Sequence, residues 1–214
     1  SEFREQSRGG VGSKGAHTRD EDFTEYIYPA TMHQTMLFFT KKGRCYWMKC
    51  YEIPEGAKNS KGRAIQNMLN IEADDSVNAF LRIGRFNDEE FLNSHYVIFA
   101  TKQGVIKKTS LKDYSRPRTN GVIAINIRED DEVVGVRLTN GHNEIILANR
   151  NGRAVRFDES LVRCMGRVST GVRGMMLDAG DDELVGMVIV NDTEKETIMV
   201  VSENGYGKRS EVDD

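Results

Sequence analysis

Lysine and arginine recur at matching places along this chain, and their chemistry suits phosphate binding. Ammonium and guanidinium groups neutralise phosphate charge, and a guanidinium can bind two phosphate oxygens at once. One set lies in or beside glycine-containing turns: Lys41, Lys42, Arg44, Lys102, Lys107, Lys108, Arg150, Arg153, Arg156, Lys208 and Arg209. A second set lies in the polar loops that follow: Arg116, Arg118, Arg163 and Arg167. These residues are candidate phosphate contacts.

Acidic residues collect in other segments, at 20–22, 72–75, 88–90, 129–132 and 178–183. The chain thus reads as repeats, each with a basic first half and an acidic second half. If these repeats lie side by side, the basic halves are expected to form a band and the acidic turns the opposite rim. A positive band around a disc would suit a wrapped duplex. The alternative is that these charges keep strand edges from aggregating. The charge pattern alone does not separate the two interpretations.

The sequence does not group residues for catalysis or metal binding. The four histidines, His17, His33, His95 and His142, are scattered and lack metal-ligand spacing. Paired aspartates occur once per repeat, at 74–75, 130–131 and 181–182. Such recurrence is typical of turn formers, because aspartate bonds to nearby backbone in turns. We therefore predict no catalytic residue and no metal site in this chain.

Residues 10–15 match the dinucleotide-binding pattern G-x-G-x-x-G. That site needs a buried strand before it and a helix after it, and the polar segment 4–8 supplies no such strand. We interpret residues 1–19 as an exposed loop that carries Arg8 and Lys14 to a phosphate backbone. Its glycines would permit close approach.

The composition bounds the class of protein. The chain has 214 residues and a net charge of −3 at pH 7, which gives enough length for a core and leaves room for a local basic surface. Its three cysteines lack zinc-ligand spacing, which fits reduced thiols in the cytoplasm. The apolar runs have the length of strands, so we predict no membrane span and no membrane partner.

The elements that must position the basic residues are β-hairpins. Residues 96–111 predict an apolar strand, a tight turn ending at Gly104 and a second strand of alternating character. Similar hairpins are predicted at 35–49, 144–157 and 197–208, at intervals of roughly fifty to sixty residues. After each of the first three hairpins we expect a polar loop, a strand led by Gly62, Gly121 or Gly171, an Asp-Asp turn and a last strand.

This pattern predicts an all-β chain, because β-branched and aromatic residues fill the apolar runs and no helical period persists for three turns. Four short strands per repeat form a propeller blade. We predict a single repeat domain over 1–214. Its parts are a partial first blade with the glycine loop (1–34), a second (35–95), a third (96–143), a fourth (144–196) and the start of a fifth (197–214).

Several segments resemble the C-terminal domain of the DNA gyrase A subunit, from the bacterial type II topoisomerases. They are GRCYWMKCYEIP (43–54), GRAIQNML (62–69), ATKQGVIKKTSL (100–111), RTNGVIAI (118–125), VVGVRLT (133–139), VRFDE (155–159), RCMGRVSTGVRG (163–174) and NGYGKR (204–209). Segment 6–12 resembles that family's seven-residue box, keeping Gln6, Arg8, Gly9, Gly10 and Gly12. Ser7 and Val11 stand where basic residues are usual, and Lys14 follows two residues later.

The resemblance implies a β-pinwheel, a propeller-like disc whose blades exchange strands. About four blades of a family domain of about six would be present, so the disc is incomplete. The resemblance also implies that duplex DNA wraps around the basic perimeter, with contacts from the box residues and the basic residues named above. Wrapping would enable ATP-dependent negative supercoiling by an A2B2 gyrase holoenzyme, built from A and B subunits, in the cytoplasm.

In that enzyme ATP and Mg²⁺ are used by other parts, so this segment needs no cofactor and is itself non-catalytic. Two alternatives remain. One is the C-terminal domain of the topoisomerase IV A subunit, which selects substrates. The other is a propeller that serves as a protein-interaction scaffold.

Overall fold

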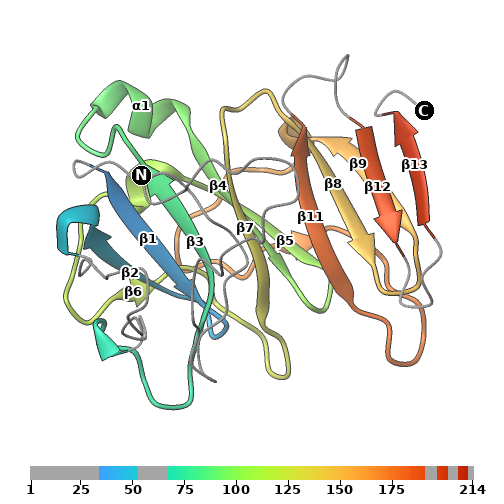
Figure 1. The fold of residues 1–214 in the computed structure, drawn as a ribbon, viewed down its shortest axis with the longest axis horizontal. Coiled ribbons are helices and arrows are strands. Elements are labelled where there is room, and N and C mark those ends of the chain that lie inside the picture. The colour runs from blue at the N-terminus through green and yellow to red at the C-terminus, as the bar shows by residue number, and fades with distance from the viewer. Residues whose placement is uncertain (1–33, 53–66, 191–196, 202–206, 212–214) are drawn as a thin grey trace, which may run out of the picture.

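The computed structural model describes residues 34–52, 67–190, 197–201 and 207–211. Three antiparallel sheets stand side by side in chain order (Figure 1), so the all-β prediction is confirmed. The sheet orders are β3-β1-β2-β6, β10-β5-β4-β7 and β11-β8-β9, followed by a β12-β13 pair. No helix in these described ranges is long and apolar enough to cross a membrane.

The strands fall close to the predicted segments. They are β1 (Thr35–Thr40), β2 (Arg44–Lys49), β3 (Val77–Ile83), β4 (Tyr96–Thr101), β5 (Val105–Ser110), β6 (Val122–Ile123), β7 (Val133–Thr139), β8 (Glu144–Asn149), β9 (Ala154–Asp158), β10 (Val172–Arg173), β11 (Leu184–Val190), β12 (Thr197–Val201) and β13 (Gly207–Glu211). Short 3-10 turns follow β2, β5 and β9, at Cys50–Glu52, Leu111–Tyr114 and Glu159–Leu161. A six-residue helix, α1 (Glu89–Ser94), links β3 to β4 and is capped by Asp88.

All four predicted hairpins are present. Gly43, Gly104 and Gly152 occupy the turns with φ between 85° and 87°, a region in which a side chain is strained. Gly205 lies outside the described residues. The turn chemistry that the sequence predicts therefore holds for the three glycines that are described.

Two glycine-led strands, those that follow Gly121 and Gly171, join the sheet of the preceding repeat. β6 pairs with β2, and β10 pairs with β5. A β-carbon on Gly171 would lie 2.4 Å from the carbonyl oxygen of Ile106, so only glycine permits this approach. The exchanged strands are two residues long, shorter than the predicted 121–127 and 171–177. The strand expected from Gly62 is wrong for Asn67–Asn70, which forms a turn, and residues 62–66 lie outside the described residues.

The paired aspartates are turn formers, as predicted. Oδ1 of Asp75 accepts from the backbone N–H of Lys42, and Oδ1 of Asp131 accepts from that of Gln103. Asp182 makes the equivalent contact with Asn151 at 3.4 Å. Each of these aspartates also accepts from the N–H of its own next residue. The turns therefore fasten the last strand of a repeat to the hairpin of the same repeat.

The core fills the space between neighbouring sheets. Phe39 of the first sheet packs edge-on against Phe99 of the second, with ring centroids 5.3 Å apart, and Tyr114 closes the cluster. A second cluster joins Ile98 and Ile106 to Leu147 of the third sheet. Each sheet thus buries its apolar faces against the next, as propeller blades do.

Candidate nucleic-acid interface

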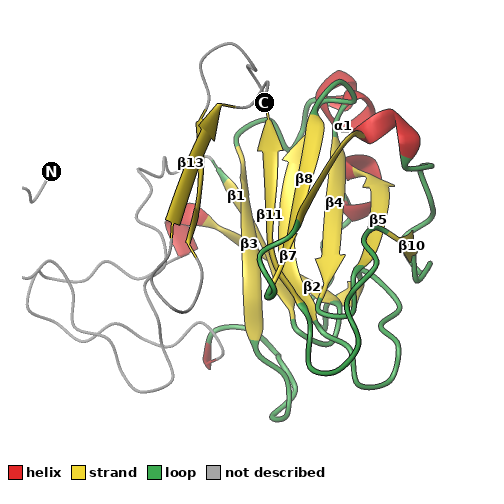
Figure 2. Ribbon diagram, turned by 90° about the vertical axis from the view of Figure 1, so that its right-hand side faces the viewer, coloured by secondary structure: helices red, strands yellow, loops and turns green. Residues whose placement is uncertain are grey.

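Two arginine-bearing loops, 115–120 and 163–170, lead from the 3-10 turns into the exchanged strands β6 and β10. Figure 2 shows β10 outside β5 at one edge of the molecule. Strand exchange makes each loop cross from its own sheet to the preceding one. Arg116, Arg118 and Arg163 are exposed there, and no carboxylate among the described residues pairs with them.

Hydrogen bonds tie each of these loops to the strand segments beside it. The guanidinium of Arg44 donates to the carbonyl oxygen of Asn120 at 2.9 Å. The guanidinium of Arg167 donates to that of Ile123 at 2.6 Å. The N–H of Asn126 donates to the carbonyl of Ser169. We call the resulting surface the arginine strip: Arg44, Arg116, Arg118, Arg163, Arg167 and Arg173.

In two blades the exchanged strand and the hairpin strand form an equivalent residue pair that contains one arginine, on opposite strands in the two cases. Arg44 of β2 lies opposite Ile123 of β6, whereas Arg173 of β10 lies opposite Val105 of β5. The arginine thus comes from the hairpin in one blade and from the exchanged strand in the next. Arg173 is exposed, and the sequence could place it beside the hairpin only once the strand exchange is known.

Most predicted hairpin residues are paired with carboxylates. Lys42 pairs with Asp74, Lys102 with Glu183 at 3.4 Å, and Arg150 with Asp181 at 3.8 Å and Glu183 at 3.6 Å. Arg153 pairs with Asp178, and Arg156 donates to Glu144 at 2.7 Å. The expectation that acidic turns form an opposite rim is therefore wrong, because the Asp-Asp turns lie beside the hairpin turns. Lys41, another predicted hairpin residue, is half-buried.

The prediction that Lys107 and Lys108 contact phosphate is wrong, because both side chains are buried. The ammonium of Lys107 donates to the carbonyl oxygens of Ala124 and Arg167 and lies 5.2 Å from the ring centre of Phe99. Burial lowers the pKa of Lys107 to about 7. Lys108 lies 3.3 Å from the buried carboxylate of Glu159. In this fold neither ammonium is available to a phosphate.

Other predicted contacts cannot be placed at this surface. Gln6, Arg8, Gly9, Gly10, Gly12 and Lys14 lie outside the described residues. Lys208 and Arg209 lie in β13, which pairs with β12. His95, interpreted as a strand-end residue, precedes β4 and stacks on Phe91. No cluster of three or more potential metal ligands occurs among the described residues.

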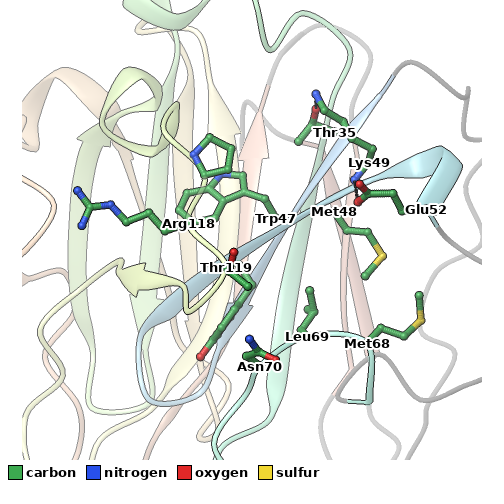
Figure 3. Close-up of a pocket in the computed structure, with 12 residues that line it drawn as sticks. Thr35, Trp47, Met48, Lys49, Glu52, Met68, Leu69, Asn70, Arg118 and Thr119 are labelled. Carbon is green, nitrogen blue, oxygen red and sulfur yellow. Dashed lines mark hydrogen bonds between the residues drawn. The ribbon is translucent and has the colours of Figure 1, made fainter.

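A hollow of about 430 Å³ lies between β2 and the 115–120 loop. Figure 3 shows Trp47 and Thr119 beside it, with Met48, Met68 and Leu69 on the other side. The guanidinium of Arg118 extends away from these residues (Figure 3). The indole N–H of Trp47 donates to the carbonyl oxygen of Tyr114 at 2.8 Å and so fixes the start of the loop.

The sequence matches a family model described as DNA gyrase C-terminal domain, beta-propeller, over residues 1–30, 34–83, 95–140, 143–191 and 196–214. It is 43% identical over 213 residues to the DNA gyrase A subunit of Salmonella typhimurium, covering 100% of this chain and 23% of that protein. It is 42% identical to the DNA gyrase A subunit of Staphylococcus epidermidis, covering 99% and 23%. The chain thus spans about a quarter of the length of these relatives.

Two solved structures share the fold. The crystal structure of the C-terminal domain of DNA topoisomerase IV superposes with a TM-score of 0.72 and 34% identity, over 83% of this chain and 53% of that one. A DNA gyrase A C-terminal domain superposes with a TM-score of 0.67 and 22% identity, over 92% and 63%. The second likeness concerns the fold alone.

Proposed function

This chain belongs to the family of DNA gyrase C-terminal domains, and we propose that it binds and bends duplex DNA along the arginine strip, without sequence specificity. The observation that carries the proposal is that exposed arginines without carboxylate partners among the described residues lie on two loops, each hydrogen-bonded to a neighbouring strand: the first to β2 through Arg44, the second to β6 through Arg167. Arginines spaced along one edge can contact successive phosphates. Bending a few tens of base pairs costs on the order of 1–10 kcal/mol, which many contacts must offset.

In the whole protein, the domain would serve the A subunit of DNA gyrase. It would wrap DNA so that an A2B2 holoenzyme introduces negative supercoils with ATP, in the bacterial cytoplasm. The domain itself would supply no catalytic residue, and ATP and Mg²⁺ would act elsewhere. The box residues 6–12 would complete the wrap, so alanines there should remove most supercoiling and spare relaxation in the holoenzyme. Loss of both activities would count against this role.

Energy transfer between dyes at the two ends of a duplex of about forty base pairs tests bending directly. We expect transfer to rise as the chain is added at low salt. Binding without a rise would contradict bending by these blades. Absence of binding would overturn the proposal and favour a protein-interaction scaffold, for which exposed Val168 and Met176 would be candidate contacts.

The C-terminal domain of topoisomerase IV is the second candidate, favoured by the TM-score of 0.72 at 34% identity. Such a domain would contact DNA to select substrates. Substituting this chain for the equivalent segment of each enzyme separates the two proposals. Restored supercoiling of relaxed plasmid supports the gyrase role, whereas restored decatenation without supercoiling supports the other.

A further inference from the structure

Lys107 and Lys108 are adjacent on β5, and each is bonded to a different part of the 163–170 loop. We propose that they are positioning residues, which hold this loop against the neighbouring sheet and so place Arg163 and Arg167 for phosphate contact. The inference rests on the proposed DNA-binding function. The two lysines would thus support DNA binding through the loop, without contacting phosphate themselves.

Lys107 holds the middle of the loop. Its ammonium donates to the carbonyl oxygen of Arg167 and, at 2.6 Å, to that of Ala124, which follows β6. The guanidinium of the same Arg167 donates to Ile123. One buried ammonium therefore ties three segments together: its own strand, the exchanged strand β6 and the loop of the next repeat. Without it, the carbonyl oxygen of Arg167 would lose this donor, whereas that of Ala124 would keep the hydroxyl of Tyr114.

Lys108 holds the start of the loop. Its carbonyl oxygen accepts from the N–H of Met165 at 2.8 Å, and its backbone pairs with that of Cys164. Its ammonium lies 3.3 Å from the carboxylate of Glu159 and 3.4 Å from the carbonyl oxygen of the same residue. Glu159 begins the 3-10 turn that leads into the loop. Lys108 therefore contacts residues on both sides of Arg163 in the chain: Glu159 before it and Met165 after it.

The preceding blade uses the same strand position in the same way, with different chemistry. Trp47 is equivalent to Lys108 in the hairpin register, and its indole N–H donates to the carbonyl oxygen of Tyr114. Tyr114 comes directly before the 115–120 loop, which carries Arg116 and Arg118. Two successive blades thus each aim a side-chain donor from the second hairpin strand at the 3-10 turn that leads into the next arginine-bearing loop. This recurrence supports a positioning role.

Amide hydrogen exchange without DNA tests the positioning directly. In Lys107→Met, we expect amides such as those of Ser169 and Asn126, which take part in loop hydrogen bonds, to exchange at least tenfold faster. The control is Lys112→Met, which removes an exposed lysine of the same repeat that pairs with Glu89. Exchange at the loop that stays unchanged in Lys107→Met would overturn the inference. If that variant does not fold, Lys107→Gln serves, because its shorter amide stops short of the two carbonyls.

Duplex affinity tests the consequence. We expect Lys107→Met to weaken binding of a forty-base-pair duplex about fivefold, and Lys112→Met to change it less than twofold. In a background carrying Arg163→Ala and Arg167→Ala, Lys107→Met should weaken binding no further, because the groups it positions are gone. An equal loss in that background would overturn the indirect role. If the unchanged chain does not bind the duplex, the proposed function fails, while the exchange experiment still decides whether Lys107 holds the loop.

Discussion

The ammonium of Lys108 lies 3.3 Å from the carboxylate of Glu159, and both side chains are buried between the second and third sheets. The hydroxyl of Thr139 and the N–H of Asn143 also donate to this carboxylate. Both carboxylate oxygens therefore have donors. The pair links β5 to the next repeat, so it acts as an ionic joint between two blades.

Removing one partner of this joint should destabilise the fold. We expect Glu159→Ala to lower the free energy of unfolding by about 3 kcal/mol, because it leaves the Lys108 charge buried and unpaired. The double variant Lys108→Met/Glu159→Leu should recover part of the loss, since Leu111 fills the equivalent position of the preceding repeat, while the hydroxyl of Thr139 and the N–H of Asn143 still lack this acceptor. Urea denaturation measures both. A double variant as unstable as Glu159→Ala would contradict this account of the joint.

Equivalent hairpin glycines should differ in their tolerance of alanine. A β-carbon on Gly104 would lie 2.7 Å from the carbonyl oxygen of Met175, whereas nothing lies within 4 Å of one on Gly152. Both have φ of 85°, so each substitution carries a conformational cost of about 1–2 kcal/mol. Gly104→Ala should cost about 1–3 kcal/mol more because of the close contact. Equal losses in thermal unfolding would show that the strand exchange does not require this glycine.

The stability that depends on Lys107 should rise with pH. Burial lowers the pKa of this ammonium from 10.5 to about 7, against a smaller opposing effect of Asp113. Arg167 lowers the pKa further, and Cys164 raises it. Between about pH 7 and pH 10.5, the Lys107 side chain of the unfolded chain holds a proton that the folded chain lacks. Raising the pH within this window therefore favours the folded state.

The slope should approach about 1.4 kcal/mol per pH unit within that window and vanish below about pH 7. Denaturation at about pH 7.5, 8.5 and 9.5 would measure the slope for the unchanged chain and for Lys107→Met, which lacks the titrating group. We expect the difference in free energy of unfolding between them to grow with pH. Parallel curves would show that Lys107 does not titrate in this range.

The arginine strip should determine the salt dependence of duplex binding. Each phosphate contact adds about 0.9 to the slope of log affinity against log salt. Replacing Arg116, Arg118 and Arg163 by alanine should therefore weaken binding and lower the slope by about 2–3. Filter binding between about 50 mM and 200 mM salt measures it, with Lys112→Ala as the control. An unchanged slope would place the contacts elsewhere.

Pattern and turn chemistry predicted the local structure well. The hairpins follow from apolar runs broken by glycine, and the Asp-Asp turns follow from the tendency of aspartate to bond to nearby backbone. Both signals act over a few residues, so they can be found without a tertiary structure. The propeller-like disc and its strand exchange were predicted only from the family resemblance, because the periodicity of a sequence does not show how its repeats pack.

The candidate site was predicted less completely. Alternation along 105–110 is typical of a strand with one exposed face, yet both faces of β5 are covered up to Thr109. The cover comes from residues 124 and 159–167, which only the fold brings there. The prediction for Lys107 and Lys108 failed for this reason. The pairing of Lys102 with Glu183 likewise joins residues far apart in the chain.

The hairpins of this chain and the turns within them follow from its amino-acid order, because they depend on neighbouring residues. Which cations remain exposed follows from the three-dimensional fold. Arg163 stays at the surface and Lys108 is buried, although both belong to the basic pattern. Whether a charged side chain meets water, a carboxylate or a carbonyl oxygen is set by segments distant in the chain, and strand exchange brings those segments together.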